Sequence, residues 1–174
     1  GTPAFLHAAR RLTKEHNALL ILDEIQSGMG RTGALFSYMQ KGVVPDILTS
    51  AKGLGGGFPV GAMLTTAEVA SAFGPGVHGT TYGGNPLAAA AALASVEIFE
   101  KEKTVEALQP KIAHLTAGLE RFRNLEHVGD IRQRGFMVGI ELVEDTATKR
   151  SYPSRERIGM KVAMEARRHG VLLR

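Results

Sequence analysis

Lys52 and Asp23 are the two residues whose types and surroundings point most directly to chemistry. Lys52 is followed by Gly53 and by three more glycines at 55–57. A lysine amine that must hold an aldehyde covalently, and then swing aside for a substrate, needs the small and flexible neighbours that glycine supplies. Asp23 follows an apolar run, and a carboxylate at such a strand end can keep a pyridine nitrogen protonated, which makes the ring an electron sink. The pair predicts a pyridoxal-phosphate site with Lys52 and Asp23 as catalytic residues.

Three motifs, in a fixed order along the chain, carry a resemblance that extends beyond this pair. They are DEIQSGMGRTG at 23–33, PDILTSAK at 45–52 and HGTTYGGNPLA at 78–88. Together they resemble the class III, ornithine-type aminotransferases. The resemblance implies pyridoxal 5'-phosphate as cofactor, an α/β fold of type I, and a small-molecule amino donor and a 2-oxo acid as substrates.

The two halves of the chain resemble different members of this class. Residues 2–86 resemble the acetylornithine and succinylornithine aminotransferases, which implies transfer from N-acetylornithine or succinylornithine to 2-oxoglutarate in arginine metabolism. Residues 87–174 are more similar to the 7,8-diaminopelargonate aminotransferases of biotin synthesis, which implies 7-keto-8-aminopelargonate as an alternative substrate. A third hypothesis is that the chain by itself is a non-catalytic part of such an enzyme.

The resemblance also implies roles for four further residues. Ile25 would pack on the face of the cofactor ring, and Gln26 would contact its phenolic oxygen. Thr81 would bind the cofactor phosphate of a neighbouring subunit, and Thr80 would border the substrate. The active sites would then be shared within a homodimer. Read without the resemblance, these residues are ordinary core and turn positions.

Several other polar residues have structural explanations as well as functional ones. Glu24 alternates to the side of the strand opposite Asp23, so we expect a structural salt bridge or a cap there. Arg132 and Arg134 could reach a substrate carboxylate, but salt bridges at a strand edge explain them equally well. The glycines after Lys52 lack the spacing of a P-loop and provide clearance instead. The six histidines show no metal-ligand spacing with acidic partners, so we predict no metal site.

Composition sets the class of protein. With 174 residues and 44% hydrophobic content, the chain is long enough for a globular core. Basic residues give a net charge of +4 but are spread beside acidic ones, which argues against a nucleic-acid partner. No apolar run approaches the roughly 20 residues of a membrane span.

The absence of cysteine is compatible with a reducing compartment, and we expect a cytoplasmic protein. Since class III subunits are much longer, we expect this chain to be an internal part of one.

Hydrophobic periodicity predicts alternating helices and strands. The strand at 18–22 is continuously apolar, which is typical of a strand buried on both faces of a parallel sheet. Thr65 or Thr66 should cap a helix that extends to Phe73, with Glu68 spaced from Thr65 as in a capping box. The remaining expected helices are 3–16, 34–40, 85–101, 104–123 and 155–169, and the remaining strands are 47–50, 60–64, 128–131, 136–143 and one beginning at 171. We expect three parts: the latter part of a large, mainly parallel cofactor-binding domain at 1–103, a linking helix at 104–124, and the start of an α+β C-terminal subdomain at 125–174.

Overall fold

The computed structural model describes residues 1–173, which form two compact units. Unit 1 comprises Gly1–Ile112 together with the short segment Arg134–Met137. Unit 2 begins at Ala113 and contains the remaining described residues. Each unit has its own three-stranded sheet.

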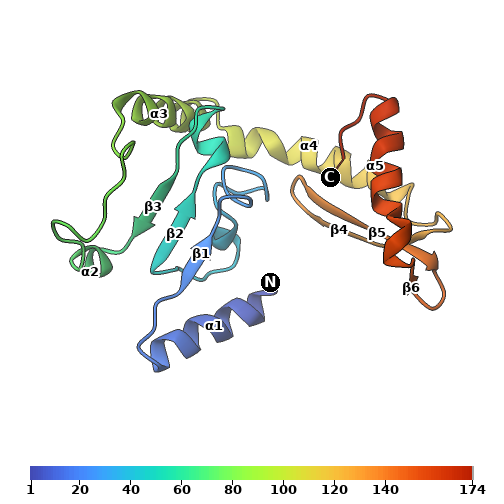
Figure 1. The fold of residues 1–174 in the computed structure, drawn as a ribbon, viewed down its shortest axis with the longest axis horizontal. Helices are drawn as coiled ribbons and strands as arrows, with labels where there is room; N and C mark the ends of the chain where they lie inside the picture. Colours follow the sequence, from blue (N-terminus) through green and yellow to red (C-terminus); the bar gives the residue numbers. More distant parts are fainter. Residues whose placement is uncertain (174) are drawn as a thin grey trace. The chain divides into compact units, whose positions relative to one another are not determined.

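The sheet of unit 1 contains β1 (Ile21–Asp23), β2 (Ile47–Ser50) and β3 (Ala62–Thr65), which lie side by side in this order (Figure 1). β1 and β2 are parallel, and β2 and β3 are antiparallel. The described part of this sheet thus has one parallel pair, as predicted for the strands that lead to Asp23 and Lys52, and one antiparallel pair. The strand predicted at 60–64 is displaced to Ala62–Thr65 and runs in the opposite direction to its neighbour.

β1 is shorter and more exposed than the sequence predicts. Leu20 is buried, but Leu19 and Ile21 are 51% and 57% exposed. Within the described residues, β1 pairs with a strand only on its β2 side, and the face that carries Ile21 is open to solvent. The expectation of burial on both faces is therefore wrong for the chain as described.

The opposite face of the sheet carries the core of unit 1. Leu48 of β2 packs there with two residues of the loop between β1 and β2, Met29 and Phe36. Partly buried side chains complete this core: Leu22, Leu35, Tyr38, Leu54 and Phe99. The sheet is thus covered on this face, whereas on the other face Ile21 of β1 is exposed and its register partner Ile47 of β2 is buried.

The helices of unit 1 begin where local capping chemistry allows. Thr2 caps α1 (Pro3–Glu15) by accepting a hydrogen bond from Phe5 N at 3.2 Å, with proline at the first helical position. Asn85 caps α3 (Pro86–Lys101) by accepting from the backbone N–H groups of two residues in its first turn. α4 (Thr104–Glu120) follows after a short break. These helices match the sequence expectation to within three residues.

The capping box expected at Thr65 is wrong. Thr66 caps the short helix α2 (Ala67–Ala70) by accepting from Val69 N, whereas Thr65 belongs to β3. The hydroxyl of Thr65 donates instead to the carbonyl oxygen of Asp46 at 2.9 Å. The helix predicted at 34–40 is reduced to a single 3-10 turn, η1 (Ser37–Gln40).

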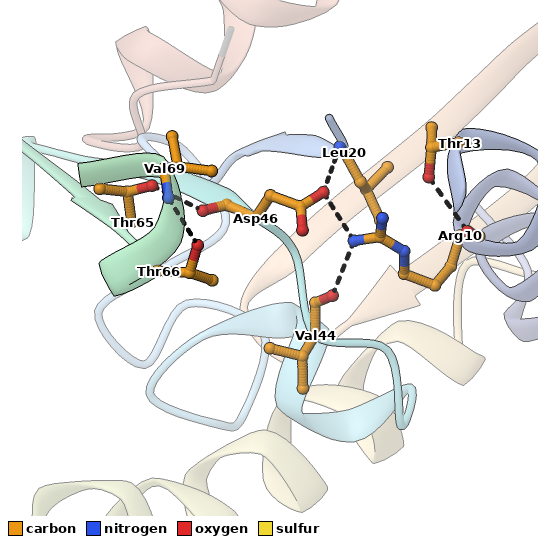
Figure 2. Close-up of polar contacts among 8 residues, drawn as sticks. All are labelled: Arg10, Thr13, Leu20, Val44, Asp46, Thr65, Thr66 and Val69. Carbon is orange, nitrogen blue, oxygen red and sulfur yellow. Dashed lines mark hydrogen bonds and ion pairs between the residues drawn. The ribbon is translucent and has the colours of Figure 1, made fainter. Parts of the chain in front are cut away.

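Asp46 fixes the beginning of β2 (Figure 2). Its Oδ2 accepts from Leu20 N and from Arg10 Nη1, each at 2.7 Å. The same guanidinium nitrogen reaches the carbonyl oxygen of Val44 at 3.4 Å. The backbone N–H of Leu20, and secondarily the Arg10 guanidinium, lower the pKa of the Asp46 carboxyl below its ordinary value. Helix α1 and the strands are thereby tied together at the end of the sheet remote from Lys52.

Unit 2 contains the end of α4, helix α5 (Ile158–Arg168) and a sheet of β4 (Val128–Arg134), β5 (Met137–Asp145) and β6 (Arg150–Ser151). Only the last residue of β4 and the first residue of β5 belong to unit 1. Leu119, Ile131 and Val143 are its buried apolar residues. β6 was not expected from the sequence. The strand expected from Val171 is not formed over the described residues 171–173, so that prediction is wrong.

Candidate active site at the ends of two parallel strands

The sheet of unit 1 brings Asp23 and Lys52 to the same edge. Asp23 is the last residue of β1, and Lys52 follows the end of β2 by two residues. Because the two strands are parallel and Asp23 is in register with Thr49, both residues leave the sheet at its carboxyl edge. Ligands of open α/β sheets bind at this edge.

Lys52 adopts a backbone conformation that L-residues rarely occupy. Its φ is +52°, at the first residue of the 3-10 turn η2 (Lys52–Gly55). A non-glycine residue held in the left-handed region costs of order 1 kcal/mol, and such residues cluster at functional sites. The Nζ of Lys52 donates a hydrogen bond to Oε1 of Gln26, which lies in the loop after β1. The structure therefore brings two of the predicted cofactor residues into contact.

Asp23 is exposed and only lightly engaged by the protein. Its Oδ1 accepts from the backbone N–H of Ile25 at 2.9 Å, which forms a local turn of the Asx type. Among the described residues, no side chain donates to the Asp23 carboxylate. Ile25 is half-buried beside it. One carboxylate oxygen is thus held in place while the other is available to a ligand.

Glu24 orders the loop that carries Gln26, as its expected structural role requires. This carboxylate is buried at 4% exposure and accepts from Ser27 Oγ at 2.5 Å. It also accepts from the backbone N–H groups of Ser37 and Tyr38, at 3.0 and 2.8 Å. Glu24 therefore caps the turn η1 from the far end of the same loop, and within residues 1–173 it forms no salt bridge.

A depression of about 610 Å³ opens beside Lys52. It is lined by Arg31, Lys52, Gly53, Gly56, Gly57, Phe58, Pro59 and Val60. A β-carbon would lie 2.7 Å from a methyl group of Val60 at Gly55 and 2.9 Å from Ser95 Oγ at Gly56, so these two glycines allow close approach of neighbouring side chains. Gly57 is in open space, and its φ of +109° favours glycine.

Sequence reasoning assigned no role to Arg31, although it lies in the first of the three motifs. Its guanidinium is exposed, and no acid among the described residues pairs with it. Two positive charges, Lys52 and Arg31, therefore flank one depression, which favours an anionic ligand.

Arg31 is held by a short segment that is distant in sequence. The backbone N–H of Phe136 donates to the Arg31 carbonyl oxygen at 2.8 Å. Gly135, with φ +61°, lies so close that a β-carbon there would be 2.5 Å from the same oxygen. Arg134 donates to Oε1 of Gln40, whose Nε2 donates to the Thr32 carbonyl oxygen at 2.9 Å. The turn at Arg134–Met137 thus supports the loop that flanks Lys52.

Thr80 and Thr81 lie in an irregular, fully exposed loop between α2 and α3. The carbonyl oxygen of Thr80 accepts a backbone hydrogen bond from Gly83 N at 3.3 Å. Neither hydroxyl bonds to Lys52, Asp23 or Gln26 within the described residues. The structure does not bring these two threonines together with the rest of the predicted site.

The remaining candidates from the sequence are engaged in other contacts. Arg132 pairs with Asp130 and Glu141, at 3.5 and 3.2 Å, which supports the salt-bridge explanation for it. Over residues 1–173, no cluster of three histidines or acids is arranged as a metal site. In the same stretch, no helix combines the length and the apolar character that crossing a bilayer requires.

The donor set at the sheet edge fits pyridoxal phosphate. Lys52 supplies an amine for the aldehyde, Asp23 a free carboxylate oxygen for the pyridine nitrogen, and Gln26 an amide for the ring hydroxyl. The hydroxyl oxygen of Thr49 is buried without a partner on the Asp23 side of the sheet among the described residues, and it is a further polar group that fits such a ligand. A phosphate would require further donors beyond these residues.

Comparison with known proteins gives the same family by sequence and by structure. The chain is 49% identical over 180 residues to the adenosylmethionine-8-amino-7-oxononanoate aminotransferase of Aquifex aeolicus, which aligns with 99% of this chain. It is 51% identical over 143 residues, or 82% of its length, to the acetylornithine/succinyldiaminopimelate aminotransferase of Yersinia pestis. The chain spans 40% and 35% of the lengths of these two relatives.

Solved structures of aminotransferases resemble this chain as well. An adenosylmethionine-8-amino-7-oxononanoate aminotransferase from Methanocaldococcus jannaschii superposes with a TM-score of 0.87 at 45% identity, over 95% of this chain and 40% of that one. A transaminase from the marine bacterium Virgibacillus gives a TM-score of 0.93 at 32% identity, over all of this chain and 41% of that one. The predicted α/β fold of type I is thereby confirmed.

The family model for class III aminotransferases matches residues 1–174. Enzymes of this class depend on pyridoxal phosphate, so the cofactor predicted from Lys52 and Asp23 is confirmed at the level of the family. The chain belongs to the class III aminotransferases.

Proposed function

We propose that the protein carrying this chain is an aminotransferase in which Lys52 holds the cofactor and moves the reacting proton. The observation that carries the proposal is the placement of a strained lysine and an open carboxylate at the same edge of two parallel strands. The contact between Lys52 and Gln26 supports it, because it joins the amine to the residue expected at the ring hydroxyl.

Each residue has one task in the proposed reaction. When bound, pyridoxal phosphate supplies an electron sink for negative charge on the substrate carbon. Lys52 Nζ would accept the proton from the substrate carbon that bears the amino group and would pass it to the cofactor carbon that carried the aldehyde oxygen. The Asp23 carboxylate keeps a proton on the ring nitrogen, and its bond from Ile25 N holds it in that orientation. Ile25 supports one face of the ring.

The substrates are an amino donor and a carbonyl acceptor, and the relatives suggest two pairs. The first candidate is adenosylmethionine with 8-amino-7-oxononanoate, which is 7-keto-8-aminopelargonate under another name. It is favoured by similarity that covers 99% of the chain. The second is N-acetylornithine or succinylornithine with 2-oxoglutarate, supported by similarity over 82% of the chain. The order of the two candidates is thus the reverse of the sequence expectation.

We further propose a cytoplasmic homodimer with shared sites. Thr81 would serve the phosphate of the neighbouring subunit and Thr80 would border its substrate. Their fully exposed loop supports this assignment, since neither hydroxyl is used within the described chain. The absence of cysteine is compatible with a reducing compartment.

Borohydride reduction of the holoenzyme tests the site. We expect peptide mapping to find the cofactor fixed on Lys52. Recovery of the cofactor on another lysine would contradict the proposal that Lys52 holds the cofactor. The two substrate pairs are then compared by kcat/KM, and activity with neither pair would leave only the general class of reaction.

A further inference from the structure

Two neighbouring hydroxyl groups at the end of β2 lie buried without a partner. They are Oγ1 of Thr49 and Oγ of Ser50. A buried hydroxyl without a hydrogen bond is costly, and such groups mark either a defect of packing or a partner not yet bound. The two residues differ in the face to which they point, because successive side chains of a strand alternate.

Thr49 shares its face with Asp23. The two are register partners in the parallel pair of β1 and β2. Neighbouring strands are about 4.8 Å apart, so side chains of partner residues on one face are within reach of each other. Ser50 is the register partner of Ala62 in β3 and points to the opposite face. Of these two hydroxyl groups, that of Thr49 lies on the face of the sheet that carries Asp23, and that of Ser50 does not.

Asp23 has unused capacity for this hydroxyl. A carboxylate accepts about four hydrogen bonds, and the bond from Ile25 N uses one of them. A threonine hydroxyl has one proton to donate, and among the described residues no other acceptor takes that of Thr49.

We propose that Thr49 is a positioning residue, which donates a hydrogen bond to the Asp23 carboxylate in the cofactor-bound protein. With Ile25 N on one oxygen and Thr49 on the carboxylate from the neighbouring strand, Asp23 would be held from two directions and would keep about two acceptor sites for the ring nitrogen. This inference rests on the proposed function, because it takes Asp23 as the acid that faces the cofactor. Thr49 itself touches Asp23 rather than the reacting atoms.

The test measures the affinity of the apoenzyme for pyridoxal phosphate by absorbance titration. Thr49→Val keeps the shape of the side chain and removes the hydroxyl, and we expect it to weaken cofactor binding about tenfold. Thr49→Ser restores a hydroxyl and should recover affinity to within about twofold of the wild type. Ser50→Ala is the matched control, since it removes the neighbouring orphaned hydroxyl from the other face, and it should leave the affinity unchanged.

A double-mutant cycle shows whether Thr49 acts through Asp23. In the Asp23→Asn background, Thr49→Val should cause no further loss beyond about twofold. Equal affinities of wild type and Thr49→Val, equal losses in Thr49→Val and Ser50→Ala, failure of Thr49→Ser to recover, or additive losses in the cycle would each overturn the proposal. Thermal unfolding of each variant confirms that it is folded during the titration.

The two proposals fail in different ways. If borohydride maps the cofactor to a lysine other than Lys52, the proposed function is wrong, and the role of Thr49 is withdrawn with it. If Lys52 is labelled and Thr49→Val binds the cofactor as tightly as the wild type, only the role of Thr49 is wrong.

Discussion

Asp46 and Asp23 lie at opposite ends of two neighbouring parallel strands, and their surroundings differ in kind. Asp46 precedes β2 and is only 22% exposed at its side chain, where it binds a guanidinium and a backbone N–H. Asp23 ends β1, is exposed, and receives a single bond from its own turn. The first carboxylate is saturated by the protein and the second is left open.

The same contrast extends to the residues around them. Near Asp46, the hydroxyl of Thr65 and the backbone N–H of Thr66 both bond to its carbonyl oxygen. Near Asp23, Thr49 has a buried hydroxyl without a partner and Lys52 has a strained backbone. One end of the sheet gains stability from its polar groups, whereas the other retains unused hydrogen-bonding capacity that a ligand can satisfy. The comparison distinguishes a carboxylate that the protein saturates, Asp46, from one that stays open to a ligand, Asp23, and this difference supports the role proposed for Asp23.

The largest expected effect comes from Lys52→Ala. Removal of the amine eliminates both the covalent attachment and the proton carrier, so kcat should fall by at least about 10⁴-fold. Lys103→Ala is the matched control, because Lys103 is an exposed lysine that is also left-handed, with φ +47°. Steady-state kinetics should show wild-type rates for the control. Substantial activity in Lys52→Ala would contradict the site assignment.

Asp23→Asn should slow the proton-transfer half-reaction by about 10³-fold while the fold is retained. An amide can still accept the bond from Ile25 N but cannot favour a protonated ring nitrogen. Single-turnover absorbance measures the half-reaction, and thermal unfolding measures the stability. Near-normal single-turnover rates would show that Asp23 does not face the ring.

Asp46→Asn should show the reverse pattern, with near-normal single-turnover rates and a loss of about 2 kcal/mol in the free energy of unfolding. The loss should depend on pH. The pKa of Asp46 is lowered in the folded state, chiefly by Leu20 N and then by Arg10, so its contribution is present above the ordinary pKa of about 3.9. It declines as the pH falls from there through the lower folded pKa.

Urea unfolding at pH 7 and at pH 3 checks this sign. The difference between wild type and Asp46→Asn should shrink at the lower pH. Glu126→Gln is the control, because Glu126 is exposed and its carboxylate has no ion pair or hydrogen bond among the described residues. A difference that grows at pH 3 would refute the assignment of the acid dependence to Asp46.

Gly135→Ala should cost about 1–2 kcal/mol of stability, because the residue is left-handed and its β-carbon would collide with the backbone of Arg31 and Thr32. Displacement of this turn should also raise the KM for an anionic substrate, since Arg31 flanks the depression beside Lys52. Gly118→Ala is the control, because a β-carbon there meets nothing within 4 Å in a helix. An unchanged KM in Gly135→Ala would show that the turn at Arg134–Met137 does not influence substrate binding beside Lys52.

The smallest expected effect is the partial recovery of activity in mixed dimers, and it concerns Thr81 in the exposed loop between α2 and α3. If Thr81 serves the neighbouring subunit, Lys52→Ala and Thr81→Ala chains are defective in different parts of one composite site. Mixed dimers would contain one site with both lesions and one with none, so co-expression should restore up to about a quarter of wild-type activity. Confirmed mixed dimers without any restoration would place Thr81 in its own subunit's site or on the surface.

Local signals in the sequence predicted many elements and the candidate catalytic pair. Thr2 and Asn85 cap the helices that their motifs predict, since a cap uses hydrogen bonds to residues two or three positions away. Lys52 and Asp23 stand out because glycine-rich and apolar neighbours surround them in sequence. Prediction failed where a neighbour in space decided the outcome. Thr65 lies in a strand rather than at a helix cap, and its hydroxyl bonds to the carbonyl oxygen of Asp46. Ile21 is exposed because no described residue covers it.

The sequence by itself determined the chemistry that this chain carries: an amine in a flexible turn, a carboxylate at a strand end, and the order of the motifs around them. The tertiary structure alone decided which polar groups are satisfied. The register of β1 with β2 places Thr49 beside Asp23, and the fold brings Arg10 to Asp46 and Gly135 to Arg31. These contacts join residues far apart in the chain, and they form only when loop-closure entropy is offset by the packing of the whole unit.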